Sequence, residues 1–334
     1  MEVEYGLLSV FVERSSMGQL IRPFFLLLSF LTLAGCSVLG PGFPDERIVR
    51  ERVLLPDIPF YAQEDYQCGP AALAMLLAWN GEALLLPALT GQVYSPSLEG
   101  SLQPAIVAAA RRYGYLVYPL DQPEALFGEL AAGHPVLVLQ NLGLTRMPRW
   151  HYAVVIGHDP EQKRIFLHSG RREAMGMSAR LFGRTWARAG HWAVVVLPPE
   201  RLPATAGESS FLAAAVGLEQ AGQWSAALLA YQAALERWPD SFGARVGLGN
   251  VRYTLADYEG AQRAFRQALL LQPANGAVMN NLALALAAAG YRQEALVVIG
   301  QGLELDETWR QELLRTRQKI VADQPWAEGG NEQN

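Results

Sequence analysis

The sequence predicts an α+β domain followed by an all-α solenoid, and three observations lead to this fold class. Up to about residue 198, runs rich in β-branched residues alternate with helical segments. Residues 197–208 then carry three prolines and a glycine, a composition in which neither a helix nor a strand persists. Beyond this connector every segment is Ala-rich and helical in pattern, and large and small residues recur with a period of 34.

The beginning of the chain has the pattern of a secretion signal. Residues 24–33 form an apolar stretch that is too short to span a bilayer and has the length of a signal-peptide h-region. We therefore expect residues 1–35 to be a cleaved signal. Three glutamates near the start suit export poorly, so Met17 is an alternative translation start.

The segment that ends the apolar stretch, Leu33-Ala34-Gly35-Cys36, resembles the bacterial lipobox. The resemblance implies that Cys36 is acylated and that residues 36–52 tether an extracytoplasmic protein to a membrane. Ser37, where an Asp would signal inner-membrane retention, implies an outer-membrane lipoprotein of the bacterial cell envelope that faces the periplasm. An ordinary signal peptide followed by an incidental Cys is the alternative.

Composition limits the partners that the chain can bind. The net charge of −5 argues against nucleic acid as a partner. The chain has five histidines and two cysteines without a tight cluster, so we expect no metal site and no cofactor.

We expect residues 53–198 to form the α+β domain. Its helices should include residues 69–79, 101–113 and 123–132, closed by the glycines at 81, 114 and 133. Its strands should include residues 135–140, 152–156, 164–170 and 192–197. The loop at 142–149 is a candidate wall of a substrate cleft.

Cys68 immediately precedes a predicted helix, because a proline follows at the first helical turn and apolar residues recur at helical spacing. At such an N-terminus the unpaired amides and the helix dipole favour a thiolate, so we expect an activated nucleophile. Acyl transfer by this thiol would also need a base and hydrogen-bond donors for the oxyanion.

The segment PFYAQEDYQCGPAALAMLL resembles the N-terminal motif of the bacteriocin-processing (double-glycine leader) cysteine peptidases, which have a papain-like fold. The resemblance implies that Cys68 is the nucleophile and that Gln63, with the backbone amide of Cys68, forms the oxyanion hole. Gln63 stands five residues before the cysteine, whereas six is common in that family, and the adjacent Gln67 is the weaker candidate.

The family places its histidine at the start of a later strand, and His151 occupies this position before the apolar run 152–156. The resemblance therefore implies that His151 is the general base. We expect His158 to lie in a solvated turn, and His134 and His191 have no comparable context.

Family members normally carry an Asp opposite the histidine, and this chain departs from that pattern. The return strand has His168 and Ser169 at about this position, so either residue is a possible orienter of the imidazole. Gln140 and Asn141 are alternatives, and Asp159 should lie at the far end of the hairpin.

The C-terminal half resembles tetratricopeptide repeats, which are helical hairpins with a period of 34 residues. Three repeats cover roughly 208–307, and residues up to 325 should add a cap helix, with a disordered tail at 326–334. Corresponding positions are Ala227, Ala261 and Ala295 (small), Tyr231, Phe265 and Ile299 (large), Gly222, Ala256 and Gly290 (turn), Trp224, Tyr258 and Arg292, and the prolines at 239 and 273. Such solenoids bind peptides or protein segments on a concave face.

These observations predict a membrane-anchored extracytoplasmic cysteine peptidase, a hydrolase of peptide bonds, with residues 199–207 linking it to a protein-binding repeat domain. The alternative is a catalytically degenerate papain-like domain that binds a peptide or serves as an assembly scaffold. The missing Asp favours the alternative, whereas the presence of Gln63, Cys68 and His151 favours an enzyme.

Overall fold

The computed structural model describes residues 51–63, 67–83 and 86–322. The predicted signal at 1–35, the alternative start at Met17, the lipidation site Cys36, most of the tether and the tail at 326–334 lie outside the described residues. Within the part that is described, no helix is long and apolar enough to cross a membrane.

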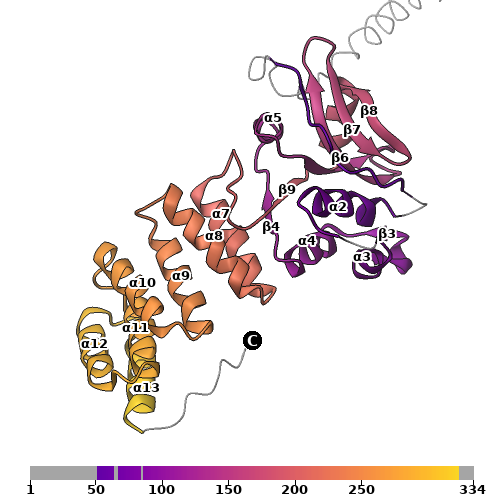
Figure 1. The fold of residues 1–334 in the computed structure, drawn as a ribbon. Helices are drawn as coiled ribbons and strands as arrows, with labels where there is room; N and C mark the ends of the chain where they lie inside the picture. The colour runs from indigo at the N-terminus through magenta and orange to yellow at the C-terminus, as the bar shows by residue number, and fades with distance from the viewer. Residues whose placement is uncertain (1–50, 64–66, 84–85, 323–334) are drawn as a thin grey trace, which may run out of the picture. The chain divides into compact units, whose positions relative to one another are not determined.

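The first half of the chain is an α+β domain, in agreement with the prediction (Figure 1). Its elements are β1 (Val53–Leu54), α2 (Cys68–Trp79), α3 (Leu86–Val93), β2 (Tyr94–Ser95), η1 (Pro96–Leu98), β3 (Gly100–Ser101), α4 (Gln103–Arg112), β4 (Leu116–Pro119), α5 (Ala125–Ala131), β5 (Val136–Asn141), β6 (Trp150–Asp159), β7 (Arg164–Ser169), β8 (Arg172–Ser178), α6 (Ala179–Ala187) and β9 (Ala193–Leu197).

An antiparallel sheet forms the centre of this half. Its strands follow the order β4-β9-β5-β6-β7-β8, and the short β1 pairs with β6. Both faces of the central strands are covered, so β5 and β9 are buried along their whole lengths. Alternate residues of β5 and β6 pack against α2 and α4 on one face and against α5 and α6 on the other.

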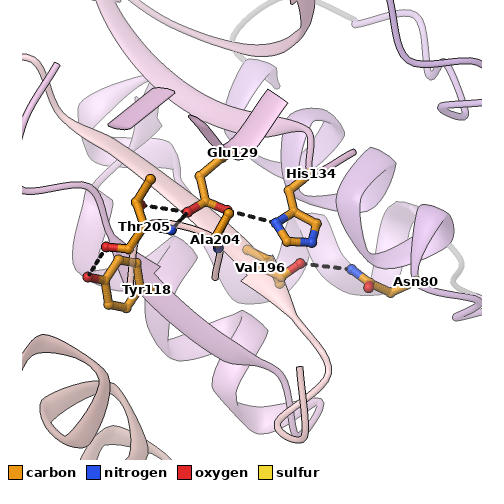
Figure 2. Close-up of polar contacts among 7 residues, drawn as sticks. All are labelled: Asn80, Tyr118, Glu129, His134, Val196, Ala204 and Thr205. Atoms are coloured by element: carbon orange, nitrogen blue, oxygen red, sulfur yellow. Dashed lines mark hydrogen bonds and ion pairs between the residues drawn. The ribbon is translucent and has the colours of Figure 1, made fainter. Parts of the chain in front are cut away.

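Glycines close the helices where the sequence predicts it. Helix α2 ends at Trp79 with Asn80 as its cap, and Gly81 follows at φ 97°, a left-handed conformation that costs glycine little. Gly114 and Gly133 close α4 and α5 at φ 80° and 86°. The Asn80 amide also donates to Val196 O of β9, which ties the end of α2 to the sheet (Figure 2).

The second half is a run of helices, as predicted, and consistent with an all-α repeat solenoid (Figure 1). Its members are α7 (Glu208–Gln220), α8 (Trp224–Arg237), α9 (Phe242–Thr254), α10 (Tyr258–Leu271), α11 (Gly276–Ala288), α12 (Arg292–Leu305) and α13 (Arg310–Val321). Consecutive helices pack against each other along this run, and α13 packs on α11 and α12 at the position of the predicted cap.

The recurring residues have distinct positions in this packing. The recurring alanines and large apolar residues are all buried, and the ring of Tyr231 fits against Gly247 while that of Phe265 fits against Gly249. The turn residues Gly222, Ala256 and Gly290 all have left-handed backbone conformations, with φ of 71°, 59° and 88°. The small residue at this position therefore reflects a constraint on the backbone.

The connector between the halves lacks regular structure, as predicted, but it is anchored at several points. The buried carboxylate of Glu129 in α5 accepts hydrogen bonds from Ala204 N (3.1 Å), Thr205 N (2.8 Å) and Thr205 Oγ1 (2.6 Å) (Figure 2). It also pairs with His134 Nδ1 at 2.7 Å. Despite its complete burial, the pKa of Glu129 is lowered, because these donors together outweigh desolvation.

Helix α7 continues the core of the first half. Its residues Phe211, Ala215 and Leu218 are fully buried in the same apolar cluster as the sheet residues Leu116 and Val195. The predicted change of fold class at the connector is correct. By contact, the described residues of both halves belong to one compact unit.

Candidate active site

The predicted nucleophile, Cys68, occupies the first position of α2. It is the only free cysteine among the residues described. Backbone amides of Tyr152, Gly69 and Cys68 itself hydrogen-bond to its sulfur and lower the thiol pKa. Burial acts in the opposite direction and is the larger effect, so the pKa of Cys68 is raised. The expectation that its helix position yields a resting thiolate is therefore wrong, because desolvation outweighs the amide donors.

The predicted base, His151, lies near the start of β6, next to the residue whose amide contacts the Cys68 sulfur. Its Nε2 is 2.8 Å from Ser169 Oγ in β7. Burial, with a smaller contribution from the charge of Arg149, lowers the pKa of His151 to about 4. The imidazole is thus neutral at pH 7, and the tautomer that donates from Nε2 to Ser169 leaves Nδ1 free as an acceptor.

Among the predicted orienters, Ser169 is the one whose side chain contacts the His151 ring in the described structure. His168 is engaged elsewhere, with Nδ1 accepting from Ala174 N and Nε2 3.1 Å from Ile58 O. Gln140 lies directly across from His151 in the sheet, but its amide donates to Thr185 Oγ1 at 2.7 Å.

Asn141 and Asp159 are also committed to other contacts. Asn141 Oδ1 accepts from the amides of Gly143 and Arg149, which shapes the following loop. Asp159 ends β6 opposite Arg164, as predicted at the far end of the hairpin.

Gln63 is buried beside the strand that holds Ser169. Its backbone amide donates to Gly170 O at 3.0 Å, and its Oε1 accepts from Gly170 N at 3.1 Å. Its Nε2 is buried and has no hydrogen-bond partner among the described residues. A buried amide donor without a partner is costly, and such a group is suited to an acceptor that arrives with a ligand.

These contacts bring the three predicted residues to the same end of the sheet. Cys68 contacts the backbone beside His151, His151 contacts Ser169, and the next residue, Gly170, holds Gln63. Within the described residues no hydrogen bond joins the Cys68 sulfur to the His151 ring. Catalytic hydrogen bonds are often long in a protein without its substrate.

Two contributors to this arrangement were missed by the sequence reasoning. The amide of Tyr152 and both backbone groups of Gly170 act through main-chain atoms, which no residue type encodes. Gly170 has φ of 61° in the β7–β8 turn, so its glycine after a strand was the one available signal.

One other histidine differs from its predicted setting, and a second has a contact that the sequence did not predict. His158, expected in a solvated turn, is buried within β6 against the ring of Phe127. His134 is the partner of Glu129. In the described part of the chain, no group of three or more His, Cys, Asp or Glu side chains is arranged to hold a metal ion.

Comparisons with known proteins found similar solved structures and one matching family model. A C39-like peptidase from Bacillus anthracis has a similar structure, with 18% identity and a TM-score of 0.39 over 44% of this chain and 98% of that chain. The peptidase domain of Streptococcus ComA, a bi-functional ABC transporter involved in quorum sensing, gives 22% identity and a TM-score of 0.34 over 42% and 98%.

A double glycine motif protease from an AMS/PCAT transporter, solved in complex with its leader peptide, gives 20% identity and a TM-score of 0.34 over 44% and 97% of the two chains. No curated protein matches this chain significantly. Residues 55–192 match the family described as "Peptidase_C39 like family". Through these residues the chain carries a C39-like peptidase domain.

Proposed function

We propose that the protein is an active cysteine peptidase that hydrolyses peptide bonds with Cys68 as nucleophile and His151 as general base. The observation that carries this proposal is the convergence of Cys68, His151 and the unpartnered amide of Gln63 at one end of the sheet. A scaffold alone would give no reason to keep the buried amide donor of Gln63 unsatisfied.

The proposed reaction begins from a neutral pair, because the pKa of Cys68 is raised and that of His151 is lowered to about 4. As the sulfur attacks the carbonyl carbon, its proton passes to His151 Nδ1. The negative charge that develops on the carbonyl oxygen is stabilised by Gln63 Nε2 and the backbone amide of Cys68. His151 then gives the proton to the leaving amine, and water hydrolyses the thioester.

Ser169 would hold the imidazole in the productive tautomer during these steps. A hydroxyl carries no charge, so it stabilises the imidazolium less than the usual carboxylate would. We therefore infer a slower enzyme than family members that have an Asp, with proton transfer concerted with attack.

We further propose that the peptidase acts outside the cytoplasm, held to the outer membrane by a lipid on Cys36 and facing the periplasm. The lipobox-like sequence supports this location. The helical run would bind a protein partner or a polypeptide substrate, which its 34-residue period supports.

A peptide vinyl sulfone tests the proposed chemistry. In a Cys36→Ser background, otherwise wild-type protein should be labelled at Cys68 roughly tenfold faster than free cysteine, or more. The reason is that a bound electrophile is held next to the thiol. Cys68→Ala should abolish labelling, and His151→Ala should slow it. Labelling no faster than free cysteine, together with no hydrolysis of peptides, would favour the degenerate domain instead.

A further inference from the structure

The loop that leads into His151 is a rigid hairpin of residues 142–149. Leu142 N donates to Arg149 O at 2.8 Å, and Leu144 and Met147 exchange backbone hydrogen bonds of 3.1 Å. Asn141 Oδ1 accepts from the amides of Gly143 and Arg149. Arg188, the residue after α6, donates to Asn141 O at 2.8 Å and anchors the start of the hairpin. The side chains of this hairpin are therefore presented on a fixed backbone.

Apolar side chains project into solvent from this hairpin and from the first residue of β6. Leu144 is 71% exposed, Met147 75% and Trp150 54%, although β5 just before them is fully buried. Ordered loops that expose several large apolar side chains together commonly contact a ligand or a partner. These residues directly precede His151 in the chain. We therefore expect them to contact a ligand bound in the candidate active site.

The same hairpin carries an uncompensated positive charge. Residues 141–157 contain Arg146 and Arg149 but no Asp or Glu. Both arginines are exposed, and neither has an acidic partner among the described residues. Other exposed arginines of the described chain do have such partners, for example Arg266 with Glu294 at 2.6 Å.

Arg149 lies close enough to the candidate base to influence it, since its charge lowers the pKa of the His151 imidazole. A cation beside a general base opposes formation of the imidazolium during catalysis. A carboxylate placed on Arg149 by the substrate would remove this opposition while it adds an attractive contact.

We propose that hairpin 142–149 selects the substrate, with Arg149 binding a carboxylate of an acidic polypeptide and Leu144, Met147 and Trp150 packing against apolar side chains beside it. This inference rests on the proposed peptidase function. The substrate class that it assigns is a polypeptide segment in which an acidic residue and a neighbouring apolar residue lie near the scissile bond.

Paired peptides test the charge contact, using the intact chain in the Cys36→Ser background. Each pair is identical except for Glu or Gln at one position, and the position is moved along both sides of the scissile bond. At one position kcat/KM for the Glu peptide should exceed that for the Gln peptide by roughly threefold to tenfold, the range of a partly exposed ion pair reinforced by hydrogen bonds.

Two variants assign this preference to its residue. Arg149→Gln should abolish the difference in kcat/KM between the Glu peptide and the Gln peptide. Arg201→Gln, which removes an exposed arginine of the connector, should leave the ratio unchanged and is the matched control. The same ratios should appear in the rate at which paired Glu and Gln vinyl sulfones label Cys68.

The apolar contact has its own test. Met147→Ser and Leu144→Ser should each reduce kcat/KM by roughly tenfold for peptides with a Leu next to the acidic position, and much less for peptides with Ala there. Both are exposed, so these changes should leave the melting temperature unaltered.

The outcomes separate the two proposals. If wild type cleaves peptides or labels at Cys68 with equal rates for Glu and Gln at every position, the substrate assignment is overturned while the peptidase function stands. If no peptide is cleaved and no electrophile labels Cys68 faster than free cysteine, the peptidase function fails, and the substrate assignment fails with it.

Discussion

At the scale of single residues, environment determines how each candidate catalytic group behaves. Cys68 has three amide donors at its sulfur, yet burial raises its pKa, whereas burial lowers the pKa of His151 to about 4. A thiolate–imidazolium pair is therefore disfavoured at rest. The uncharged hydroxyl of Ser169, 2.8 Å from His151, does not reverse this balance.

Replacing Ser169 by Asp should change the resting state of the pair. A carboxylate within hydrogen-bond reach favours the imidazolium and raises a histidine pKa by about 1 to 3 units. Alkylation of Cys68 by iodoacetamide at pH 6–7 should then accelerate about tenfold or more, because more thiolate is present. Ser169→Ala provides the comparison without a charge, and an unchanged pH profile in Ser169→Asp would exclude Ser169 as the orienter.

The lowered pKa of His151 also makes folding depend on pH. The unfolded chain binds a proton at His151 near pH 6.5, whereas the folded protein resists protonation until about pH 4. The free energy of unfolding should therefore fall as the pH drops from 6.5 towards 4, with a contribution from this residue of at most about 3 kcal/mol.

Urea denaturation of wild type and His151→Gln at pH 7 and pH 4.5 measures this contribution. The variant should lose less stability between the two pH values than wild type. His158 and His168, whose pKa values are also lowered by burial, are present in both proteins and cancel in the comparison. Equal losses would show that His151 is not the buried neutral group described above.

At the scale of elements, the solenoid turns show how a repeated sequence position reflects a backbone constraint. Gly222 and Gly290 adopt left-handed conformations without a side-chain penalty, whereas Ala256 adopts φ of 59° with one. Ala256→Gly should therefore stabilise the protein by roughly 1 kcal/mol, and Gly222→Ala and Gly290→Ala should each destabilise it by about 1 kcal/mol. Thermal melts of the three variants measure these effects. A lower melting temperature for Ala256→Gly would contradict the proposed backbone constraint.

Elements with strong local signals could be predicted from the sequence. Helix α2 and the solenoid helices follow from proline, glycine and apolar spacing, and β5, β6, β7 and β9 follow from their β-branched runs. Strand β8 and helix α6 were missed, because β8 contains no β-branched residue and the helical pattern of α6 extends over only nine residues. Their structure depends on pairing with β7 and on packing against β5.

The candidate site, like the fold, is only partly predictable from local sequence, because some of its contacts join residues that are distant in the chain. Motif spacing predicted Cys68, His151 and Gln63 as catalytic residues, and it limited the predicted orienter to a few residues. The preference for Ser169 over His168 comes from the contacts that occupy His168. These contacts are with Ile58, which is distant in the sequence, and with Ala174 of the neighbouring strand β8. The net pKa of Cys68 depends on burial by the whole fold, which a local helix signal does not contain.

At the scale of the whole molecule, the two halves share a core and a polar network. Helix α7 contributes Phe211 and Leu218 to the cluster that covers the sheet. Arg111 of α4 lies against Gly217 of α7, so closely that a Cβ at Gly217 would clash with its guanidinium group. The connector is held by Glu129. Stability of the peptidase half should therefore depend on the first helices of the solenoid.

Truncation tests this dependence. A chain that ends after Pro198 loses Ala204 and Thr205, which donate to Glu129, and exposes the face of the sheet that α7 covers, so it should aggregate or melt at least about 10 °C below the full chain. A chain that ends after Gln272 keeps the connector and the helices α7–α10, and it should retain most of the stability of the peptidase half. Glu129→Gln in the full chain should cost about 2 to 4 kcal/mol, because an amide nitrogen then faces buried donors. A soluble chain ending at Pro198 with an unchanged melting temperature would instead establish the peptidase half as an independent domain.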